Sequence, residues 1–418
     1  MVSKEVNHSF LVLNNPVFKY DGNYYMFVLK HRKLVKIKDK RITKQTINKL
    51  ENFVKKQWLN YVPEKKSCVE RNQVIVSLIT TRNCNLWCVY CFAKWWEDNS
   101  NLSFTAAKKL IDKVSLNQPI PNIKITFFGW EPTMNFPLIK EVISYCKGIQ
   151  WKNFSYHITT NWITTKENLL FLIKNKVDIT ISSDWYPAIQ DKNRPVKWWW
   201  KSSPFLESSI KFLVENNKKF KVRITVTEDT VGKMLLITKY FHKLWCEILH
   251  FEPVNPSWRW DKMKQPDPKL FAKNFIKVLD FAHDNNMKIV NSAYLNLLQP
   301  ACYYCWSIVW DKLILSPDGT ISACFELQKK DQDSVFCIWQ QKDDWELVYN
   351  VRNKEKLSEF SVENFEKCNE CFAKYICSGW CPIRNFKHWT EDWPNEYWCT
   401  FKRIIIQNLL ERIAKNSQ

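Results

Sequence analysis

The chain has 418 residues, with 62 Lys and Arg against 42 Asp and Glu, which gives a formal net charge of +20. This length allows two or three domains, so a small disulfide scaffold is excluded and the 15 cysteines indicate metal binding. We find no signal peptide and no apolar run near the ~20 residues of a membrane span, and we expect a cytoplasmic protein without a membrane partner. The positive charge would suit nucleic acid or an acidic peptide. It is scattered along the chain, as a biased genome composition also produces, and we expect no nucleic-acid partner.

Residues 1–72 are predicted to form a small N-terminal unit. Asp21-Gly22 predicts a hairpin turn between two strand-like runs, and the charged segment Pro63–Asn72 predicts a linker. The predicted elements are strands at 10–13, Val17–Tyr20, Tyr24–Leu29 and Leu34–Ile37, and a helix at Thr43–Trp58.

Residues 73–290 alternate between strand-like and helix-like segments. The candidate strands are Val74–Thr80, Ile123–Phe128, Phe154–Thr159, Val177–Ser183, Val222–Thr227 and Ile248–Glu252. Helical periodicity lies between most of them, for example at Thr105–Leu116, Leu138–Lys147, Glu167–Lys174 and Pro204–Asn216. Six such repeats predict an α/β fold, a partial (β/α)6 TIM-like barrel with a parallel sheet inside and helices outside. Residues 291–418 show little periodicity and are predicted to form a Cys-rich, loop-rich third domain.

The most specific motif is the cysteine triplet Cys84-x3-Cys88-x2-Cys91. Cubane iron–sulfur clusters are normally held by four thiolates, so three can hold a cluster and leave its fourth iron open to another ligand. Such a site is suited to chemistry rather than to electron transfer alone. A zinc knuckle or buried structural thiols are the alternatives for a triplet taken by itself.

Other distinctive residues follow the predicted strands at their carboxyl ends. The triplet follows the first strand, the Gly-Trp-Glu-Pro segment 129–132 the second, Asn161 the third, Ser183 the fourth and Glu252 the sixth. Barrel enzymes assemble their active sites at this end of the sheet, so the pattern favours an enzyme.

With these motifs the chain resembles a radical S-adenosylmethionine (SAM) enzyme, and the aromatic Tyr90 before the last cysteine fits the signature. The resemblance implies that the three thiolates bind a [4Fe–4S] cluster whose open iron chelates SAM. One electron then cleaves SAM to methionine and a 5′-deoxyadenosyl radical that takes hydrogen from the substrate. An electron donor such as a flavodoxin or ferredoxin is therefore implied as a partner.

The resemblance also implies further SAM-binding residues, with Tyr90 among them. Segment 129–132 resembles the Gly-Gly-Glu-Pro segment of the family, which places backbone atoms of Gly129 and the Glu131 carboxylate near the SAM ammonium. Ser183 and Arg194 resemble residues that meet the ribose and the carboxylate, for which a guanidinium is apt. Asn161 lies on the corresponding turn after the third strand.

Tryptophan stands where the family has glycine, at Trp130, Trp162 and Trp185. The chain has 22 Trp and only 6 Gly, and the two types together are about as frequent as glycine alone usually is, about 7%. We hypothesise that the gene comes from a lineage that reads UGA as glycine, and that UGA is translated here as tryptophan. Trp95-Trp96 and Trp198–Trp200 look like glycine-rich loops read in the same way. A protein that is truly rich in Trp is the alternative.

The C-terminal third resembles the SPASM extension found in this family. Its cysteines have the matching order, which is Cys305, Cys324, Cys368, Cys371, Cys377, Cys381 and Cys399. The resemblance implies two auxiliary [4Fe–4S] clusters. The first would be held by Cys305, Cys324 and Cys381 with Cys302 as the candidate fourth ligand, and the second by Cys368, Cys371, Cys377 and Cys399. Two zinc ribbons are the alternative, and Cys68, Cys146, Cys246 and Cys337 receive no function.

Relatives with this extension mostly modify ribosomally made peptides or proteins, which implies a peptide maturase that installs a thioether or other cross-link. The N-terminal unit resembles a leader-peptide recognition element, which can bind the leader as an added strand; a packing extension is the alternative. Anaerobic sulfatase maturases, which form formylglycine, are a second candidate. They carry Asp directly after the cysteine that corresponds to Cys324, and their triplet starts close to the N-terminus. This chain has Phe325-Glu326 there and over 80 residues before the triplet, and both departures weaken this candidate; Glu326 could still act as its base. A non-catalytic iron–sulfur scaffold that binds peptide is the third.

Overall fold

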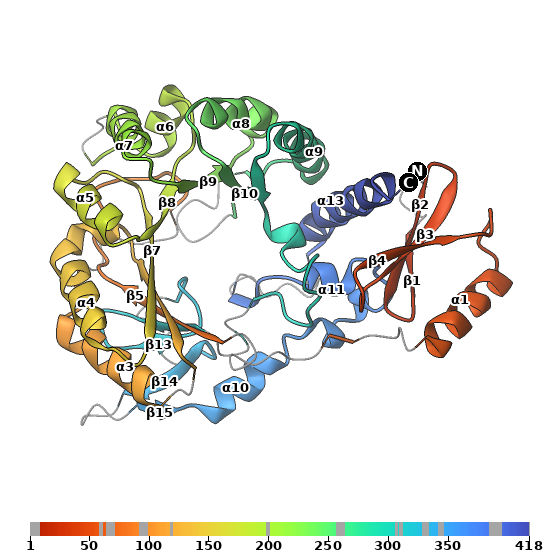
Figure 1. Cartoon of the computed structure of the whole chain (residues 1–418), viewed down its shortest axis with the longest axis horizontal. Coiled ribbons are helices and arrows are strands. Elements are labelled where there is room, and N and C mark those ends of the chain that lie inside the picture. Colours follow the sequence, from red (N-terminus) through yellow and green to blue (C-terminus); the bar gives the residue numbers. More distant parts are fainter. Residues whose placement is uncertain are drawn as a thin grey trace.

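The computed structural model describes residues 9–57, 62–63, 72–91, 99–117, 120–197, 201–255, 264–305, 308, 312–327, 334–341, 347–383 and 395–417. In these ranges the chain forms a curved parallel sheet with helices on its outer side, a small antiparallel sheet at the far end of the molecule, and a C-terminal region between the two (Figure 1). None of the helices in these ranges has the length and apolarity needed to cross a bilayer. Cys68 and the tryptophans at 58, 95–96 and 198–200 lie outside the described residues.

The N-terminal sheet has the strand order β1-β2-β3-β4, with every pair antiparallel. Asp21 and Gly22 both have positive φ, which is the geometry that a two-residue hairpin turn requires. The elements are β1 Phe10–Val12, β2 Asn15–Tyr20, β3 Asn23–Val28, β4 Lys33–Ile37 and α1 Lys44–Lys56, which confirms the predicted small sheet.

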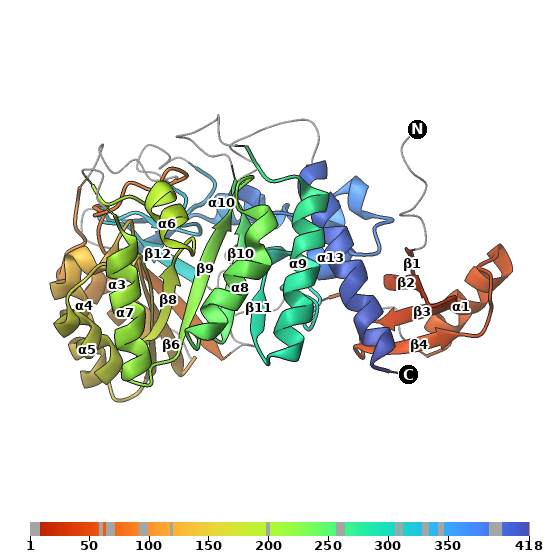
Figure 2. The same ribbon diagram turned by 90° about the horizontal axis from the view of Figure 1, so that it is seen from above.

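Each face of this sheet packs against a different partner. Val17 and Met26 belong to a core shared with Val54 of α1. Phe18 and Phe27, on the other face, belong to a core made mostly of residues from the C-terminal third. The C-terminal helix α13 (Glu396–Lys415) contacts β2 directly (Figure 2). The N-terminal unit therefore packs on the C-terminal region.

The predicted partial barrel is confirmed. Its parallel strands are β5 Gln73–Ile79, β6 Asn122–Phe128, β7 Asn153–Thr160, β8 Asp178–Ser182, β9 Phe220–Val226, β10 Ile248–Pro253 and β11 Lys288–Val290, and each pairs with the next. The helices are α3 Phe104–Asn117, α4 Phe136–Gly148, α5 Lys166–Lys174, α6 Pro187–Asn193, α7 Ser203–Glu215, α8 Met234–Lys243 and α9 Pro268–Asp284. Alternate strand residues such as Ile123, Ile125 and Phe127 are fully buried in the core with these helices, so the intervening residues face the barrel interior.

The C-terminal third continues the barrel sheet. β12 (Lys312–Leu315) runs parallel to β5 on the side away from β6. The antiparallel strands β13 Ile321–Ser322, β14 Cys337–Gln341 and β15 Leu347–Tyr349 extend this edge. The remaining helices are α10 Val351–Ser358, α11 Lys374–Cys377 and α13, which packs along α9 (Figure 2).

Four helices end in the same way, with the second residue after the helix in the left-handed region. These residues are Lys176, Asn217, Trp245 and Asn286, after α5, α7, α8 and α9. At α8 the Trp245 N–H donates to the His242 carbonyl at 3.0 Å and the Cys246 N–H to the Phe241 carbonyl at 3.0 Å. These two bonds form a Schellman motif, whose left-handed position is usually occupied by glycine.

Candidate active site

The cysteine loop, residues 80–91, leaves the carboxyl end of β5. Its backbone pairs with the segment around Arg194: the Trp87 N–H donates to the Pro195 carbonyl at 2.8 Å and the Val89 N–H to the Asn193 carbonyl at 2.8 Å. At its start, the Arg82 guanidinium is buried and pairs with Asp318 of the β12–β13 turn at 2.8 Å. The loop is thus held from two sides by segments that are distant in sequence.

The three thiols of the triplet are half-buried and not disulfide-bonded. Burial raises the pKa of the Cys84 thiol, and the neighbouring Cys88, Glu131 and Cys91 raise it further. Cys84 Sγ also accepts from the Leu86 N–H at 3.4 Å and from Asn161 Nδ2 at 3.7 Å. Such N–H donors orient thiolate ligands and support metal binding, so the residues fit the cluster that the motif implies.

Within the described ranges, no three His, Cys, Asp or Glu side chains converge closely enough to hold a single metal ion. The thiols of a cubane bind different irons at different corners, and they therefore stand further apart than the ligands of one zinc ion. A cubane and a zinc knuckle both stay open for the triplet.

Glu131 joins the ends of β6 and β7. Its fully buried carboxylate accepts from the backbone N–H and the hydroxyl of Thr133, the Thr160 hydroxyl at 2.6 Å and the Asn161 N–H at 2.7 Å. Burial raises the pKa of Glu131, while these hydrogen bonds oppose the rise. Asn161 in turn donates to Asn85 of the cysteine loop at 2.7 Å. The predicted residues Glu131 and Asn161 therefore lie against the triplet.

Gly129 allows this close approach. Its φ is +144°, and a Cβ atom there would lie 2.6 Å from the Thr81 carbonyl oxygen. The Glu131 N–H donates to the Asn83 carbonyl at 3.0 Å, so the 129–132 turn and the cysteine loop share backbone hydrogen bonds.

Tyr90 and Arg194 meet at a residue that the sequence analysis did not single out. The Tyr90 hydroxyl donates to Asp184, and Arg194 Nε donates to the other carboxylate oxygen at 3.1 Å. The guanidinium also stacks over the Tyr90 ring, 5.1 Å from its centre. Asp184 is 1% exposed and Arg194 8%, so this is a buried charge pair. The sequence did contain a signal, since Asp184 follows Ser183 at the end of the fourth strand.

Ser183 lies in the same turn. Its hydroxyl is fully buried, accepts from the Trp185 N–H at 3.1 Å, and donates to Gln190 Oε1 at 3.4 Å. It is thus beside the Asp184–Arg194 pair.

The SPASM-like cysteines fall into the two predicted groups. Burial raises the pKa of Cys324, with Glu326, Cys381 and Cys305 as neighbours that raise it further. Burial raises the pKa of Cys368 to about 12, with Cys377, Cys371 and Cys399 adding to the rise. The Cys302 thiol donates instead to the Pro63 carbonyl at 2.9 Å. Its ligation, like the other cysteine assignments, stays a prediction.

Phe325 and Glu326 lie next to the first of these groups. The Glu326 N–H donates to Cys324 Sγ at 3.4 Å, and Phe325 stacks on Phe128 at the end of β6 with ring centres 4.1 Å apart. The candidate base is therefore beside Cys324.

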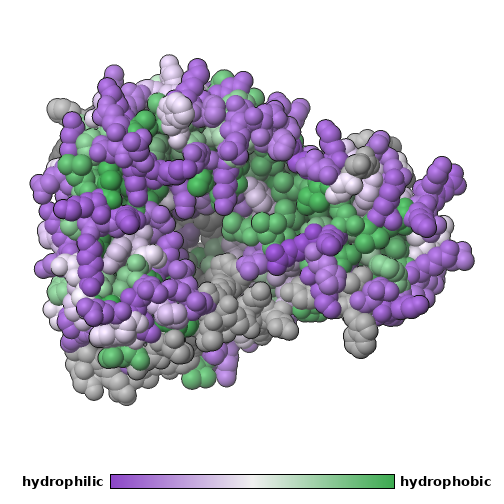
Figure 3. Space-filling model, viewed as in Figure 1, coloured by the Kyte–Doolittle hydropathy of each residue, from purple (hydrophilic) through white to green (hydrophobic). Residues whose placement is uncertain are grey.

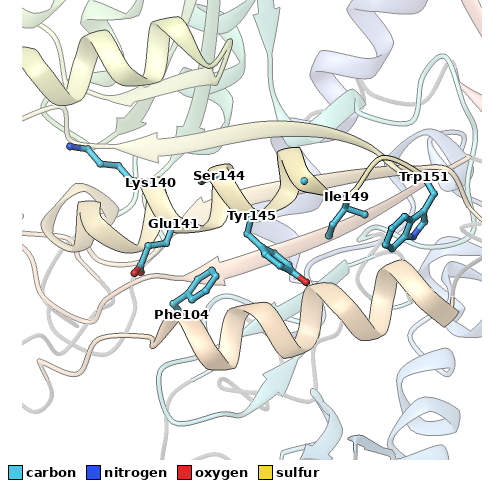
Figure 4. Close-up of a pocket in the computed structure, with 8 residues that line it drawn as sticks. Phe104, Lys140, Glu141, Ser144, Tyr145, Ile149 and Trp151 are labelled. Atoms are coloured by element: carbon cyan, nitrogen blue, oxygen red, sulfur yellow. The ribbon is translucent and has the colours of Figure 1, made fainter.

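A surface groove of 770 Å³ lies elsewhere, between α3 and α4 on the outer side of the barrel. It is lined by Phe104, Tyr145 and Trp151, among others, and holds none of the predicted site residues (Figure 4). It takes no part in the site.

Known proteins resemble this chain in sequence and in fold. The family model "Radical SAM superfamily" matches residues 78–184. An uncharacterized protein of Methanocaldococcus jannaschii is 28% identical over 69% of this chain and 97% of its own length. A cysteine-type anaerobic sulfatase-maturating enzyme of Clostridium novyi is 24% identical over 80% of this chain and 95% of its own.

Two solved structures share the fold. The anaerobic sulfatase-maturating enzyme anSMEcpe with bound AdoMet and Cp18Cys peptide superimposes with a TM-score of 0.66 at 17% identity, covering 82% of this chain and 98% of that one. Streptococcus suis SuiB bound to its precursor peptide SuiA gives 0.55 at 16% identity, covering 82% and 77%. Residues 78–184 therefore match the radical SAM superfamily, and the chain is similar in sequence to an anaerobic sulfatase-maturating enzyme and in fold to anSMEcpe and SuiB.

Proposed function

We propose that this enzyme modifies a ribosomally made peptide, installing a thioether or other cross-link. The observation that carries the proposal is the convergence of the cysteine loop, Glu131, Asn161 and the Asp184–Arg194 pair at one end of the barrel. When bound, a [4Fe–4S] cluster with SAM supplies the radical that removes hydrogen from the substrate. The two peptide complexes among the related structures support a peptide substrate.

The chain's own residues position these groups. Cys84, Cys88 and Cys91 hold the cluster, and the N–H donors around Cys84 stabilise its thiolate. Arg194 donates its Nε hydrogen to Asp184, and its terminal nitrogens would donate to the SAM carboxylate. Ser183 and Tyr90 lie beside the Asp184–Arg194 pair, and Glu131 fixes the turn whose backbone would meet the SAM ammonium.

We further propose that the two other cysteine groups hold auxiliary [4Fe–4S] clusters, with eight thiolates if Cys302 is included. They would accept the electron left after hydrogen removal or position the peptide. A flavodoxin or ferredoxin would supply the first electron in the cytoplasm, where thiols stay reduced.

The N-terminal sheet is our candidate for leader binding. Its edge strand β4 pairs with β3 on one side, and the described residues around it include the exposed Lys33, Lys36 and Lys38. An acidic leader added as a strand along this edge would gain main-chain hydrogen bonds and favourable charge.

A sulfatase-maturing activity is the second candidate, because a maturase of that class is 24% identical over 80% of this chain. Glu326 would then act as the base. Incubating the enzyme separately with a sulfatase-derived Cys peptide and with a short Cys-containing precursor encoded beside its gene distinguishes the two. Formylglycine would appear in the first peptide, and loss of hydrogen by cross-linking in the second.

The central test is anaerobic reconstitution with iron and sulfide, followed by dithionite and SAM. We expect about twelve irons per chain and formation of 5′-deoxyadenosine. Cys88→Ala should lose the activity, whereas Cys146→Ala, on α4 and in the hydrophobic core, should keep it. A protein that binds iron but makes no 5′-deoxyadenosine would be the non-catalytic scaffold.

We also infer that glycine is the native residue at many tryptophan positions. Trp162 and Trp185 have φ of +69° and +84°, which large L side chains rarely adopt. The indole N–H groups of both are buried and lack an acceptor within the described residues. A buried unpaired donor costs about 1–3 kcal/mol. Mass spectrometry of protein from its native source should find glycine at both positions, and intact indoles would refute the inference.

A further inference from the structure

The inner face of the barrel sheet is basic. Lys124 on β6, Lys221 and Arg223 on β9, and Lys312 on β12 all alternate with core residues that face the outer helices, and so they point into the lumen. Strands β5–β10 and β12 contain only two acidic residues, Asp178 and Glu252. Glu252 is engaged by Ser292 and His250, which leaves the inner face of these strands with an excess of positive charge.

Three of these lysines gather near the amino ends of the strands. Lys124, Lys221 and Lys312 each lie within the first three residues of their strand, opposite the end that carries the cysteine loop. Lys312 and Lys124 are both in register with Ile75 between them. Lys124 has a partner in Asp178 at 3.9 Å, but that carboxylate is 59% exposed and is screened by solvent.

His157 lies within electrostatic reach of all three lysines. It faces the lumen from β7 and its ring bonds the Thr180 hydroxyl at 3.0 Å. Burial lowers the pKa of His157 to about 4, and Lys124, Lys221 and Lys312 all contribute to the lowering, opposed by Asp178. Figure 3 shows a hollow between the barrel wall and the C-terminal region in the view down the barrel, with hydrophilic residues on the wall.

We propose that this lysine cluster (Lys124, Lys221 and Lys312) binds a carboxylate side chain of the peptide substrate. The proposal rests on the proposed peptide-modifying function. Lysines gathered in a partly desolvated lumen favour a counter-charge, and a peptide that reaches the radical site through the lumen passes them. Lys124 and Phe128, at the far end of β6, are separated by about 13 Å of strand, at about 3.3 Å per residue.

Lys312 has a second role, because its ammonium stacks over Phe325 at 3.6 Å and lies in the field of Cys305 and Cys324. Lys124 and Lys221 are therefore the positions to test. The lumen variant is Lys124→Gln with Lys221→Gln. The matched exterior variant is Lys147→Gln with Lys211→Gln, on the outer helices α4 and α7.

The probe is a fluorescein-labelled decapeptide of alternating Ala and Glu, compared with the same peptide carrying Gln, by fluorescence anisotropy on the anaerobic holoenzyme. The unsubstituted enzyme should bind the Glu peptide about tenfold tighter than the Gln peptide. In the lumen variant this preference should shrink about fivefold, because two partly buried ion pairs are lost. The exterior variant should bind as the unsubstituted enzyme does. Equal losses in both variants, or no preference for Glu at all, would overturn the proposal.

Two further measurements separate the causes of failure. Lys124→Arg with Lys221→Arg keeps the charge and should restore the Glu preference; if it binds as poorly as the Gln pair, charge is not what binds and the proposal fails. Formation of 5′-deoxyadenosine without peptide is measured on the unsubstituted enzyme. If 5′-deoxyadenosine forms but the enzyme shows no preference for the Glu peptide, only the proposal for the lysine cluster is refuted. If the enzyme prefers the Glu peptide but forms no 5′-deoxyadenosine, only the proposed chemistry is refuted.

Discussion

At the scale of single residues, the motifs predicted the side chains that line the site but not the contacts that hold them. Tyr90 and Arg194 could be assigned from their place in the sequence. The role of Asp184, which links the two, could not be predicted from the sequence. It depends on the cysteine loop folding back onto the segment after α6. A buried carboxylate shared by a phenol and a guanidinium fixes both side chains, which would lower the entropy cost of the SAM binding that we propose for them.

Asp184→Asn should therefore weaken SAM binding. The Arg194 guanidinium would lose its charged partner in a buried site, and we expect SAM affinity to fall at least about tenfold while iron content is kept. Asp229→Asn is the control, because that carboxylate forms an ion pair with Lys192 in which both side chains are about two-thirds exposed. Equilibrium SAM binding measures both. Unchanged affinity in Asp184→Asn would mean that Arg194 is held by packing alone.

His157 should make the fold sensitive to mild acid. Its pKa is lowered to about 4 in the fold, so it stays neutral there while the unfolded chain takes up a proton below about pH 6.5. Stability is then present above that pH and is lost as pH falls toward 4. Between pH 7 and pH 5, the unfolding free energy of the unsubstituted protein should fall by about 2 kcal/mol more than that of His157→Gln. Urea denaturation at the two pH values measures both. An equal fall in unfolding free energy in both proteins would contradict the lowered pKa of His157.

At the scale of elements, the sequence predicted what local patterns control. Strands β5–β10 have apolar runs bounded by turns, and all six agree with the predictions. The strands β12–β15 were not predicted, because segments of two to five residues show no periodicity. β12 in addition pairs with β5 across more than 200 residues of chain. Helix ends were also hard to predict where tryptophan occupies the left-handed position after the helix that is usually glycine. Trp245 after α8 is an example.

Trp245→Gly should therefore stabilise the protein. The indole is 80% exposed, so little packing is lost, while the left-handed backbone at φ +60° is relieved of its strain. We expect a gain of about 1 kcal/mol in unfolding free energy. Trp151 is 64% exposed and has no positive φ. Trp151→Gly should therefore lower the unfolding free energy by about 0.5 kcal/mol, because glycine raises the conformational entropy of the unfolded chain. The same sign for both variants would count against the strain argument.

At the scale of the whole molecule, the division at residues 72 and 290 stays a prediction, and the packing crosses both boundaries. Phe18 and Phe27 of the N-terminal sheet are buried in a core with residues of the C-terminal third. β12 joins that third to the barrel sheet. We infer that the N-terminal sheet and the C-terminal region unfold together.

Phe27→Ala should lower the unfolding free energy by about 3–5 kcal/mol, since it leaves a cavity in this shared core. Phe53→Ala on α1, at a residue 38% exposed, should change it by less than about 0.5 kcal/mol. Urea denaturation of the anaerobic protein, followed by tryptophan fluorescence and by cluster absorbance, gives both numbers. Separate transitions by the two probes in Phe27→Ala would mean that the sheet unfolds by itself.

The Arg82–Asp318 ion pair has a consequence for how this enzyme can be divided. Arg82 is 5% exposed and its partner comes from the turn between β12 and β13. A shortened chain that keeps only the predicted barrel loses Asp318 and its turn, so the start of the cysteine loop is no longer held from this side. Minimal versions made by cutting at the barrel boundary should therefore lose the metal centre itself, and shortened designs need a neutral residue at position 82.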